Sequence, residues 1–287
     1  MNVLVTGCYG QLGTEMRKIA ASDQLHHWFF TDIDTLDICD HDAVERYFTE
    51  NRIDICVNCA AYTAVDRAED EPEIAERVNV TASRILAETC KRHQSLLIHV
   101  STDYVFDGQG NRPYREDDPT GPTSVYGMTK LEGEKAIQES DCRYCIVRTA
   151  WLYSSTGKNF VKTMLSLADT HDSINVVCDQ KGTPTWAGDL AQAIQLLINH
   201  YGMEPVQEIF HFTNEGITTW YDFTVAILAI AGKTCQVNPI TTDQYPTKAT
   251  RPAYSVLDKS KIKQTLGMEI PFWKDSLAKC IEELKNK

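Results

Sequence analysis

Two side chains that could handle a proton together stand four residues apart near the middle of the chain. Of twelve tyrosines, only Tyr126 has a lysine four residues later, in Tyr126-Gly-Met-Thr-Lys130. On a helix such residues share a face, so the phenol and the ammonium can reach one point. An ammonium lowers the ordinary tyrosine pKa of about 10 by stabilising the phenolate. The spacing therefore predicts a tyrosine that protonates a carbonyl oxygen, whereas such a pair on its own is more often a surface contact.

A glycine-rich turn near the N-terminus would supply the second part of this chemistry. The β-prone run Asn2–Thr6 leads into Gly7-Cys-Tyr-Gly10-Gln-Leu-Gly13, and residues 15–21 have a helical pattern. Glycine permits positive φ and close approach of a phosphate, and a helix start offers free N–H groups to an anion. A strand, a glycine turn and a helix are typical of dinucleotide-binding proteins. The G-x-x-G-x-x-G spacing differs from the generic G-x-G-x-x-G, and another kind of glycine-rich turn is the alternative.

An acidic residue should bind the adenosine ribose of such a dinucleotide. Asp32 follows the predicted strand His27–Thr31, about 20 residues beyond the glycines, where ribose-binding acids lie. Asp34 and Asp37 are close rivals. Because no Arg or Lys lies between Ala20 and Asp40 to receive a 2′-phosphate, the sequence favours NADH over NADPH.

Alternating strand and helix patterns must position these residues. We predict further strands at 54–58, 96–101 and 144–149, helices at 43–50 and 124–137, and a long helix opened by Asp70 and Pro72. This alternation up to about residue 150 predicts an α/β fold with a doubly wound parallel (Rossmann) sheet. Ligands lie beyond the carboxyl ends of parallel strands, which places Thr102 beside a substrate and residues 59–66 beside a cofactor.

The pattern loosens beyond Trp151. Helices at 160–168, 187–199 and 221–231 are separated by β-like pieces at 174–177 and 208–212. We therefore divide the chain into a dinucleotide-binding domain, residues 1–150, which also receives later segments, and a smaller substrate-binding part, residues 151–287. The smaller part should cover the carboxyl edge of the sheet and close a cleft.

Composition excludes several classes of function. The 287 residues are 43% hydrophobic and 24% charged, with a net charge of −12 and no basic tract. That charge argues against binding nucleic acid or an anionic membrane surface, which both require clustered Lys and Arg. No run approaches the roughly 20 apolar residues of a membrane span, and the first residues do not resemble a signal peptide. We expect a cytoplasmic protein.

The ten cysteines include two C-x-x-C pairs, Cys56/Cys59 and Cys142/Cys145. Zinc binding and thioredoxin-like redox chemistry are the alternatives for such pairs. Both pairs lie in strand-like runs, where residues three apart point to opposite faces. We therefore interpret them as free thiols packed as small apolar side chains, and we assign no metal ligands.

The glycine turn, Thr102 and the Tyr126/Lys130 pair together resemble the site of the extended short-chain dehydrogenases/reductases. Longer motifs are similar to the dTDP-4-dehydrorhamnose reductase family in order and over nearly the whole chain. They are Ala60-Ala-Tyr-Thr-Ala-Val-Asp-Arg-Ala-Glu69, Ser101-Thr-Asp-Tyr-Val-Phe-Asp107, Tyr126-Gly-x-x-Lys-x-x-Gly-Glu134, Arg148-Thr-Ala-Trp-Leu-Tyr153, Asn159-Phe-Val, Asp179-Gln-x-Gly-x-Pro-Thr185 and Arg251-Pro-x-x-Ser255.

The resemblance implies reduction of the C4 ketone of dTDP-4-dehydro-β-L-rhamnose to dTDP-β-L-rhamnose with NADH or NADPH. It gives Tyr126 the role of proton donor and Thr102 that of hydrogen-bond donor to the carbonyl. Lys130 would hold the nicotinamide ribose and tune Tyr126. Tyr104 and Trp151 would contact the sugar, and Arg251 is the candidate for the diphosphate of the sugar nucleotide. A core aromatic is the alternative for Trp151, and a helix cap is the alternative for Asn159.

The full prediction comprises three groups of residues. The catalytic group is Tyr126, Lys130 and Thr102. The cofactor group is Gly7, Gly10, Gln11, Leu12, Gly13, Asp32, Asp37, Ile38, Ala60, Ala61, Tyr62 and Lys130. The substrate group is Thr102, Asp103, Tyr104, Tyr126, Trp151, Asn159 and Arg251.

Two other functions remain open at this stage. One is a related sugar-nucleotide reductase, dehydratase or epimerase. Dehydration is disfavoured because Tyr104 follows Asp103 where dehydratases of this kind usually carry a glutamate. The other is a non-catalytic protein similar to the regulatory subunit of methionine adenosyltransferase. Some members of the reductase family are Mg²⁺-linked dimers, so a homodimer is an open expectation, but no ligand cluster here assigns a metal.

Overall fold

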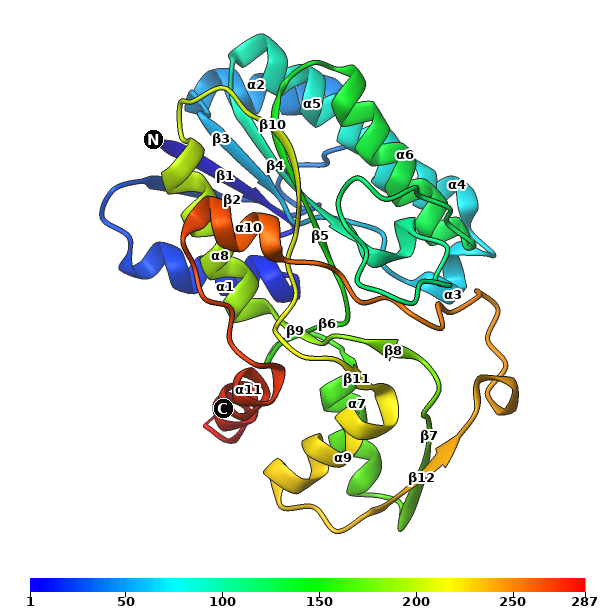
Figure 1. Ribbon diagram of the computed structural model, residues 1–287. Helices are drawn as coiled ribbons and strands as arrows, with labels where there is room; N and C mark the ends of the chain where they lie inside the picture. Colours follow the sequence, from blue (N-terminus) through cyan, green and yellow to red (C-terminus); the bar gives the residue numbers. More distant parts are fainter. Residues whose placement is uncertain (287) are drawn as a thin grey trace.

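The computed structural model describes residues 1–286, and its centre is a sheet of six parallel strands (Figure 1). The strand order is β10-β5-β4-β3-β1-β2. This arrangement confirms the predicted doubly wound parallel sheet. The strands are β1 (Asn2–Thr6), β2 (His27–Phe30), β3 (Ile55–Asn58), β4 (Leu96–Thr102), β5 (Arg143–Thr149) and β10 (Gln207–His211).

The order of the strands fixes where a ligand can bind. From β1 the chain continues to β2 on one side, and β3 pairs with β1 on the other, with Val5 aligned to both Phe30 and Val57. The crossovers therefore change direction at β1, and a crevice forms at the carboxyl ends of the strands there. The glycine turn follows β1 directly, so it lies in this crevice.

Helices cover both faces of the sheet, which is why its strands are apolar on both faces. The helices α1 (Gln11–Ser22), α8 (Ala187–Tyr201) and α10 (Ser260–Leu266) pack on one face around Met16, Ile194 and Ile262. The helices α2 (His41–Asn51), α5 (Ala82–His93) and α6 (Val125–Glu139) pack on the other face around Phe48, Leu86 and Ile137. Figure 1 shows the two layers on opposite sides of the strands.

The predicted long helix is real, but its middle turn is π-helical. After the short α3 (Val65–Ala68), it runs as α4 (Pro72–Glu76), η1 (Arg77–Thr81) and α5. The wider turn brings the buried Asn79 amide inward to bond the backbone N–H of Tyr62 at 2.9 Å and the Thr129 hydroxyl at 3.1 Å. A Cβ on Gly133 would collide with the Asn79 carbonyl oxygen. This turn therefore fixes the depth of α6, the helix that carries Tyr126 and Lys130.

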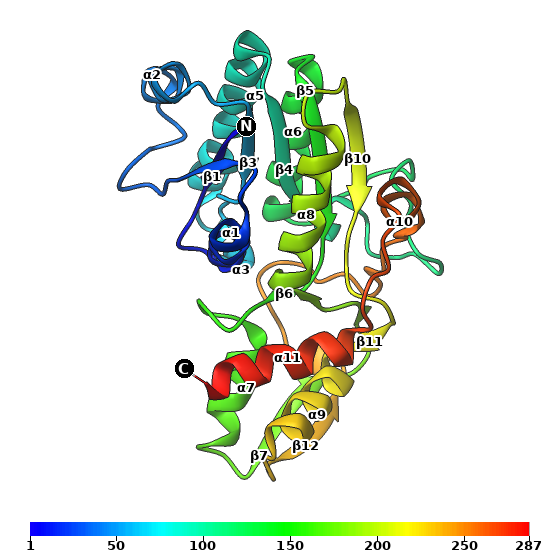
Figure 2. The same ribbon diagram turned by 90° about the vertical axis from the view of Figure 1, so that its left-hand side faces the viewer.

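The smaller part lies at the carboxyl edge of the sheet (Figures 1 and 2) and has its own core around Tyr153, Phe223 and Trp273. Its helices are α7 (Phe160–Ala168), α9 (Trp220–Ala231) and α11 (Trp273–Lys285), and its strands are β6 (Leu152–Tyr153), β7 (Ser173–Val177), β8 (Lys181–Gly182), β9 (Thr185–Trp186), β11 (Thr218–Thr219) and β12 (Gln236–Ile240).

The piece at 208–212 was wrongly expected among the pieces of the smaller part. It forms β10, which pairs with β5 over five residues, from Gln207 opposite Tyr144 to His211 opposite Arg148. The strand buries Phe210 and Phe212 against α8 and α10, so the main sheet recruits it. Within residues 1–286, no helix combines the length and apolar character needed to cross a membrane.

Candidate active site

The glycine turn is built by two close approaches of backbone. Gly7 has φ 62°, and a Cβ there would lie 2.8 Å from the backbone of Ala60 after β3. A Cβ on Gly13 would collide with the Gly7 carbonyl oxygen. Gly10 caps α1, which begins at Gln11, so the first N–H groups of the helix open at the turn. The turn can therefore receive an anionic group at the end of β1.

Two cavities meet at this turn. One, of about 550 Å³, contains Tyr126, Lys130 and Trp151 and is called here the Tyr126 cavity. The other, of about 540 Å³, contains Asp32, Asp37 and Ile38 and is called the Asp32 cavity. Gly10, Cys59 and Ala61 line both. A dinucleotide has two nucleosides joined by a diphosphate, and this pair of cavities bridged by a helix N-terminus fits that shape.

Most of the predicted cofactor residues are brought to these cavities. Gly7, Asp32, Asp37, Ile38 and Ala60 line the Asp32 cavity, Gly10 and Ala61 line both, and Gln11, Leu12 and Lys130 line the Tyr126 cavity. Two predicted residues line neither: Gly13 and Tyr62. Gly13 is a packing residue inside the turn, and the Tyr62 hydroxyl donates to Glu71 at 2.6 Å. Their predicted contact with the cofactor stays a prediction.

The Asp32 carboxylate is fixed by backbone. Its oxygens accept from the N–H groups of Tyr9 and Ile33, each at 2.9 Å, which ties the end of β2 to the glycine turn. Of its rivals, Asp34 does not line the cavity, and Asp37 accepts from Arg77 at 3.1 Å. Arg77 was not predicted as a cation for a 2′-phosphate because it lies far beyond residues 20–40, which follow the glycine turn. Arg77 enters the cavity from η1, and its only sequence signal is its place on the long helix.

Tyr126 is positioned by the start of α6. The Ser124 hydroxyl caps this helix by accepting from the Gly127 N–H at 3.1 Å, and the Tyr126 ring meets the Tyr104 ring edge-on at 5.5 Å. Burial raises the pKa of Tyr126, although a hydrogen bond with Thr102 acts in the opposite direction. The expected lowering of this pKa by Lys130 is therefore wrong for the free protein, because loss of hydration outweighs every favourable contact.

Lys130 lies one turn further along α6, with only 2% of it exposed. Its side-chain nitrogen Nζ is 2.8 Å from the carbonyl oxygen of Val100 and 3.1 Å from Nε2 of His99, both on β4. Burial lowers the pKa of Lys130 to about 8, opposed by the charge of Glu134. The lysine is therefore anchored to the strand below it rather than to Tyr126.

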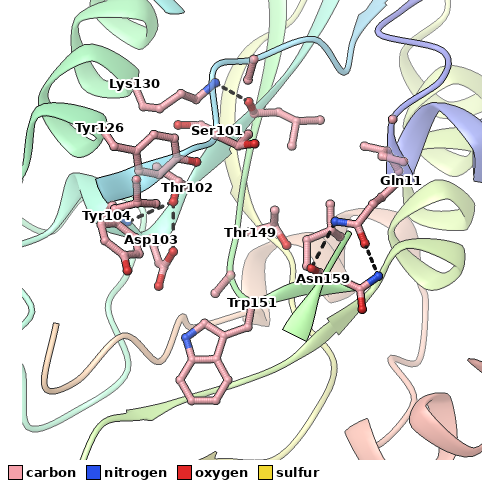
Figure 3. A pocket seen from close by; sticks show the side chains of 18 of the residues that line it. Gln11, Ser101, Thr102, Asp103, Tyr104, Tyr126, Lys130, Thr149, Trp151 and Asn159 are labelled. Atoms are coloured by element: carbon pink, nitrogen blue, oxygen red, sulfur yellow. Dashed lines mark hydrogen bonds between the residues drawn. The ribbon is translucent and has the colours of Figure 1, made fainter. Parts of the chain in front are cut away.

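Polar groups follow the end of β4, as predicted. The Thr102 hydroxyl donates to Oδ1 of Asp103 at 3.0 Å and accepts from the Tyr104 N–H at 3.2 Å (Figure 3). Burial raises the pKa of Asp103 to about 6, although hydrogen bonds with Ser255 and Thr102 act in the opposite direction. Asp103 lines the Tyr126 cavity, so its carboxyl group suits a hydroxyl group of a bound ligand.

Two tryptophans form one wall of the Tyr126 cavity. Trp151 has φ 49° and stacks on Trp220 with ring centroids 3.5 Å apart and planes 11° apart. Gly182 lies against the Trp151 indole so closely that a Cβ would approach it to 2.6 Å. Trp151 thus lines the cavity and also packs against the core of the smaller part. Trp220, at the start of α9, was missed because nothing in its local sequence points back to residue 151.

Of the predicted substrate residues Asn159 and Arg251, only Asn159 lines the Tyr126 cavity. Asn159 caps α7 through the Lys162 N–H at 3.1 Å, and its amide nitrogen also donates to Gln11 at 2.9 Å inside the Tyr126 cavity. It is therefore both a helix cap and a lining residue. Arg251 is paired with Asp66 and does not line the cavity. One of its guanidinium nitrogens, Nη1, is buried without a hydrogen bond.

No disulfide joins any of the ten cysteines. All ten are free thiols, and Cys56 and Cys142 are buried. Within residues 1–286, no group of three His, Cys, Asp or Glu side chains is arranged to hold a metal ion.

The sheet, the glycine turn at its switch point and the cavity with Thr102, Tyr126 and Lys130 define a Rossmann-type protein of the extended short-chain dehydrogenase/reductase class. The family model described as "RmlD substrate binding domain" matches residues 1–286. The chain belongs to this family.

Its relatives agree with this membership. A dTDP-4-dehydrorhamnose reductase from Aggregatibacter actinomycetemcomitans is 42% identical over 283 residues, covering 96% of each chain. The structure of a dTDP-4-dehydrorhamnose reductase from Clostridium acetobutylicum is 41% identical with a TM-score of 0.95, covering 99% of this chain and 100% of that one. The structure of a Bacillus anthracis enzyme of the same name, in complex with NADP, is 33% identical with a TM-score of 0.92, covering 98% and 99%. The resemblance inferred from the sequence is confirmed.

Proposed function

We propose that this protein reduces the C4 ketone of dTDP-4-dehydro-β-L-rhamnose to dTDP-β-L-rhamnose, using a reduced nicotinamide dinucleotide. The observation that carries the proposal is that Tyr126, Thr102 and Lys130 lie in the Tyr126 cavity, which meets the Asp32 cavity at the glycine turn. The names of relatives at about 40% identity support the substrate and the place of the reaction in dTDP-rhamnose synthesis.

Tyr126, Thr102 and Lys130 have different roles in the reduction. The cofactor supplies a hydride to C4, and negative charge then develops on the carbonyl oxygen. Tyr126 donates its phenolic proton to that oxygen, and its raised pKa keeps the proton in place until the charge appears. Thr102 lies beside Tyr126 and donates a second hydrogen bond once its hydroxyl turns away from Asp103. Lys130, which lines the same cavity, holds the nicotinamide ribose.

The sugar nucleotide should lie between the two parts of the chain. Trp151 and Tyr104 face the sugar, Asp103 accepts a hydrogen bond from one of its hydroxyls, and Asn159 contacts it as well. We keep Arg251 as the candidate for the diphosphate, which requires it to exchange Asp66 for a phosphate oxygen. In this division residues 1–150, with β10, α8 and α10, bind the dinucleotide. Most of residues 151–287 bind the sugar nucleotide.

The choice between NADH and NADPH depends on the Asp32 cavity. Asp32 suits the ribose hydroxyls of NADH, whereas Arg77 offers a cation to a 2′-phosphate. The Bacillus anthracis structure contains NADP, which supports use of NADPH by the family. We therefore propose that both cofactors are accepted. A homodimer, a cytoplasmic location and any role of Mg²⁺ stay predictions.

One assay tests the function. dTDP-4-dehydro-L-rhamnose is generated in situ, this protein is added with NADH or NADPH, and absorbance loss is followed with identification of the product. We expect cofactor oxidation with dTDP-rhamnose formed. Cofactor binding without oxidation would contradict the assignment and would favour another keto-sugar, or the regulatory-subunit alternative if the protein co-purifies with a catalytic subunit.

A further inference from the structure

A chain of buried polar side chains runs beneath the Tyr126 cavity, across three neighbouring strands. It joins Thr6 on β1, Asn58 on β3 and His99 on β4 to Lys130 on α6, and each is at most 2% exposed. The contacts are 2.6 Å from the Thr6 hydroxyl to Oδ1 of Asn58, 3.0 Å from Nδ2 of Asn58 to Nδ1 of His99, and 3.1 Å from Nε2 of His99 to Nζ of Lys130.

The direction of these hydrogen bonds can be deduced from one backbone group. The N–H of Ala60 lies 3.2 Å from the Asn58 side chain, and a backbone N–H can only donate. The atom that it faces is therefore the amide oxygen, which leaves the amide nitrogen facing Nδ1 of His99. Because an amide nitrogen can only donate, Nδ1 must accept and carries no proton.

The state of the imidazole follows. An imidazolium has protons on both nitrogens, so His99 is neutral, and its single proton is on Nε2. Burial also lowers the pKa of His99 well below its ordinary value. Nε2–H then donates toward Nζ of Lys130, and Nζ can accept only as an uncharged amine. The amine still donates to the Val100 carbonyl oxygen at 2.8 Å.

We propose that the Asn58–His99 pair stabilises the uncharged amine of Lys130, so that this lysine gives up its proton more readily than an exposed lysine does. His99 touches neither cavity and acts on the reaction only through Lys130, so it is a positioning residue. The lowered pKa of Lys130, about 8, agrees with this assignment. The proposal deepens the proposed function and rests on it only for the role of Lys130.

The other titratable groups around Lys130 do not reverse this conclusion. Glu134, one turn further along α6, favours the ammonium, but it is paired with Arg148 of β5 at 2.7 Å. The Cys59 thiol after β3 is kept neutral because burial raises its pKa. Tyr126 and Asp103 line the same cavity, and burial raises the pKa of both.

The first test reads the tautomer of His99 in the free enzyme. NMR spectra of ¹⁵N-histidine-labelled protein distinguish a protonated from an unprotonated ring nitrogen, and the His99 signals are identified by their loss in His99→Gln. We expect a proton on Nε2 and none on Nδ1 from pH 6 to 9. A proton on Nδ1, or on both nitrogens, would overturn the proposal.

The second test reads Lys130 directly, with ¹³Cε-labelled lysine and Lys130→Arg to identify the signal. We expect a titration midpoint about two units below the ordinary lysine value. In His99→Gln the amide oxygen can turn to accept from the ammonium, so the midpoint should rise by one unit or more, a tenfold gain in proton affinity. His211→Gln is the matched control, because His211 is also buried and neutral but lies on β10. It should leave the Lys130 midpoint unchanged.

A second variant covers the case in which His99→Gln does not fold. Asn58→Asp places a carboxylate opposite Nδ1, moves the imidazole proton there and leaves Nε2 to accept from the ammonium, so the Lys130 midpoint should again rise. An unchanged midpoint in a folded variant would overturn the proposal. Neither measurement uses substrate or cofactor, so an inactive protein in the reductase assay would not affect them.

Discussion

The two cavities that meet at Gly10 are built in different ways. The Asp32 cavity is lined by segments near the ends of β1, β2 and β3 and by η1, all within the first 80 residues, and its geometry comes largely from backbone. The Tyr126 cavity gathers segments from residues 10 to 220. It contains the buried side chains of Lys130 and Asp103, and Trp151, whose backbone has a positive φ. Dinucleotide binding therefore depends on local turns, whereas the chemistry depends on tertiary convergence.

The largest expected effect lies in the Tyr126 cavity. Tyr126→Phe keeps the ring but removes the proton donor, so kcat should fall about 10²-fold or more. Dinucleotide binding, measured by fluorescence titration, should stay within a factor of two. Tyr47→Phe, on α2 outside both cavities, is the control and should keep full activity. Near-normal turnover in Tyr126→Phe would remove its role as the acid.

The matching change at the glycine turn should affect binding and stability instead. Gly7→Ala and Gly232→Ala both place a Cβ at positive φ, which costs about 1–2 kcal/mol. Only Gly7 also faces backbone, at 2.8 Å, whereas nothing lies within 4 Å of the Gly232 position. Urea unfolding should therefore show a greater loss of stability for Gly7→Ala than for Gly232→Ala, and only Gly7→Ala should weaken dinucleotide binding. Equal effects would show that backbone approach at the turn is unimportant.

A pH-dependent effect should distinguish the buried acid of the Tyr126 cavity. The pKa of Asp103 is raised to about 6, so ionising this carboxyl group costs the folded protein stability. The cost is absent below the ordinary pKa of 3.8 and is complete once the pH has risen through 6. Asp103→Asn removes this cost, and its free energy of unfolding should exceed that of the unmodified protein at pH 8 by on the order of 1–2 kcal/mol.

The gain from Asp103→Asn should disappear by pH 4. Urea unfolding at both pH values measures the difference in the free energy of unfolding. The control is Asp34→Asn, a substitution of an exposed aspartate. A gain that is the same at pH 4 and pH 8 would contradict the assigned titration.

The smallest expected effect concerns the aromatic wall. Trp220→Leu removes the stacking partner of Trp151, which contributes about 0.5–1.5 kcal/mol beyond burial. We expect KM for the sugar nucleotide to rise by about threefold to tenfold, with kcat and dinucleotide affinity nearly unchanged. The circular dichroism couplet of the stacked indoles should also vanish. An unchanged KM would show that Trp151 does not need its partner.

Much of the fold could be predicted because its signals are local. The strand runs, the start of the long helix at Pro72 and the glycine spacing each reflect backbone constraints that act within a few residues. The position of Asp32 could be predicted for the same reason, because it directly follows a strand. Tyr126 and Lys130 could be placed in one cavity because one helix turn separates them. Prediction failed at positions such as 208–212, where a short apolar strand can join any sheet edge that accepts it.

What the sequence determined by itself is the set of chemical groups and their local spacing: a phosphate-binding turn, a tyrosine one turn from a lysine, and polar residues after β4. Only the tertiary structure decided their electrostatic state and their neighbours. It buried Tyr126 so that its pKa rises, set Lys130 against His99, stacked Trp220 on Trp151 and brought Arg77 to the Asp32 cavity. The physical reason is that hydration and long-range packing depend on the whole assembled chain, whereas turns and helix faces depend on adjacent residues.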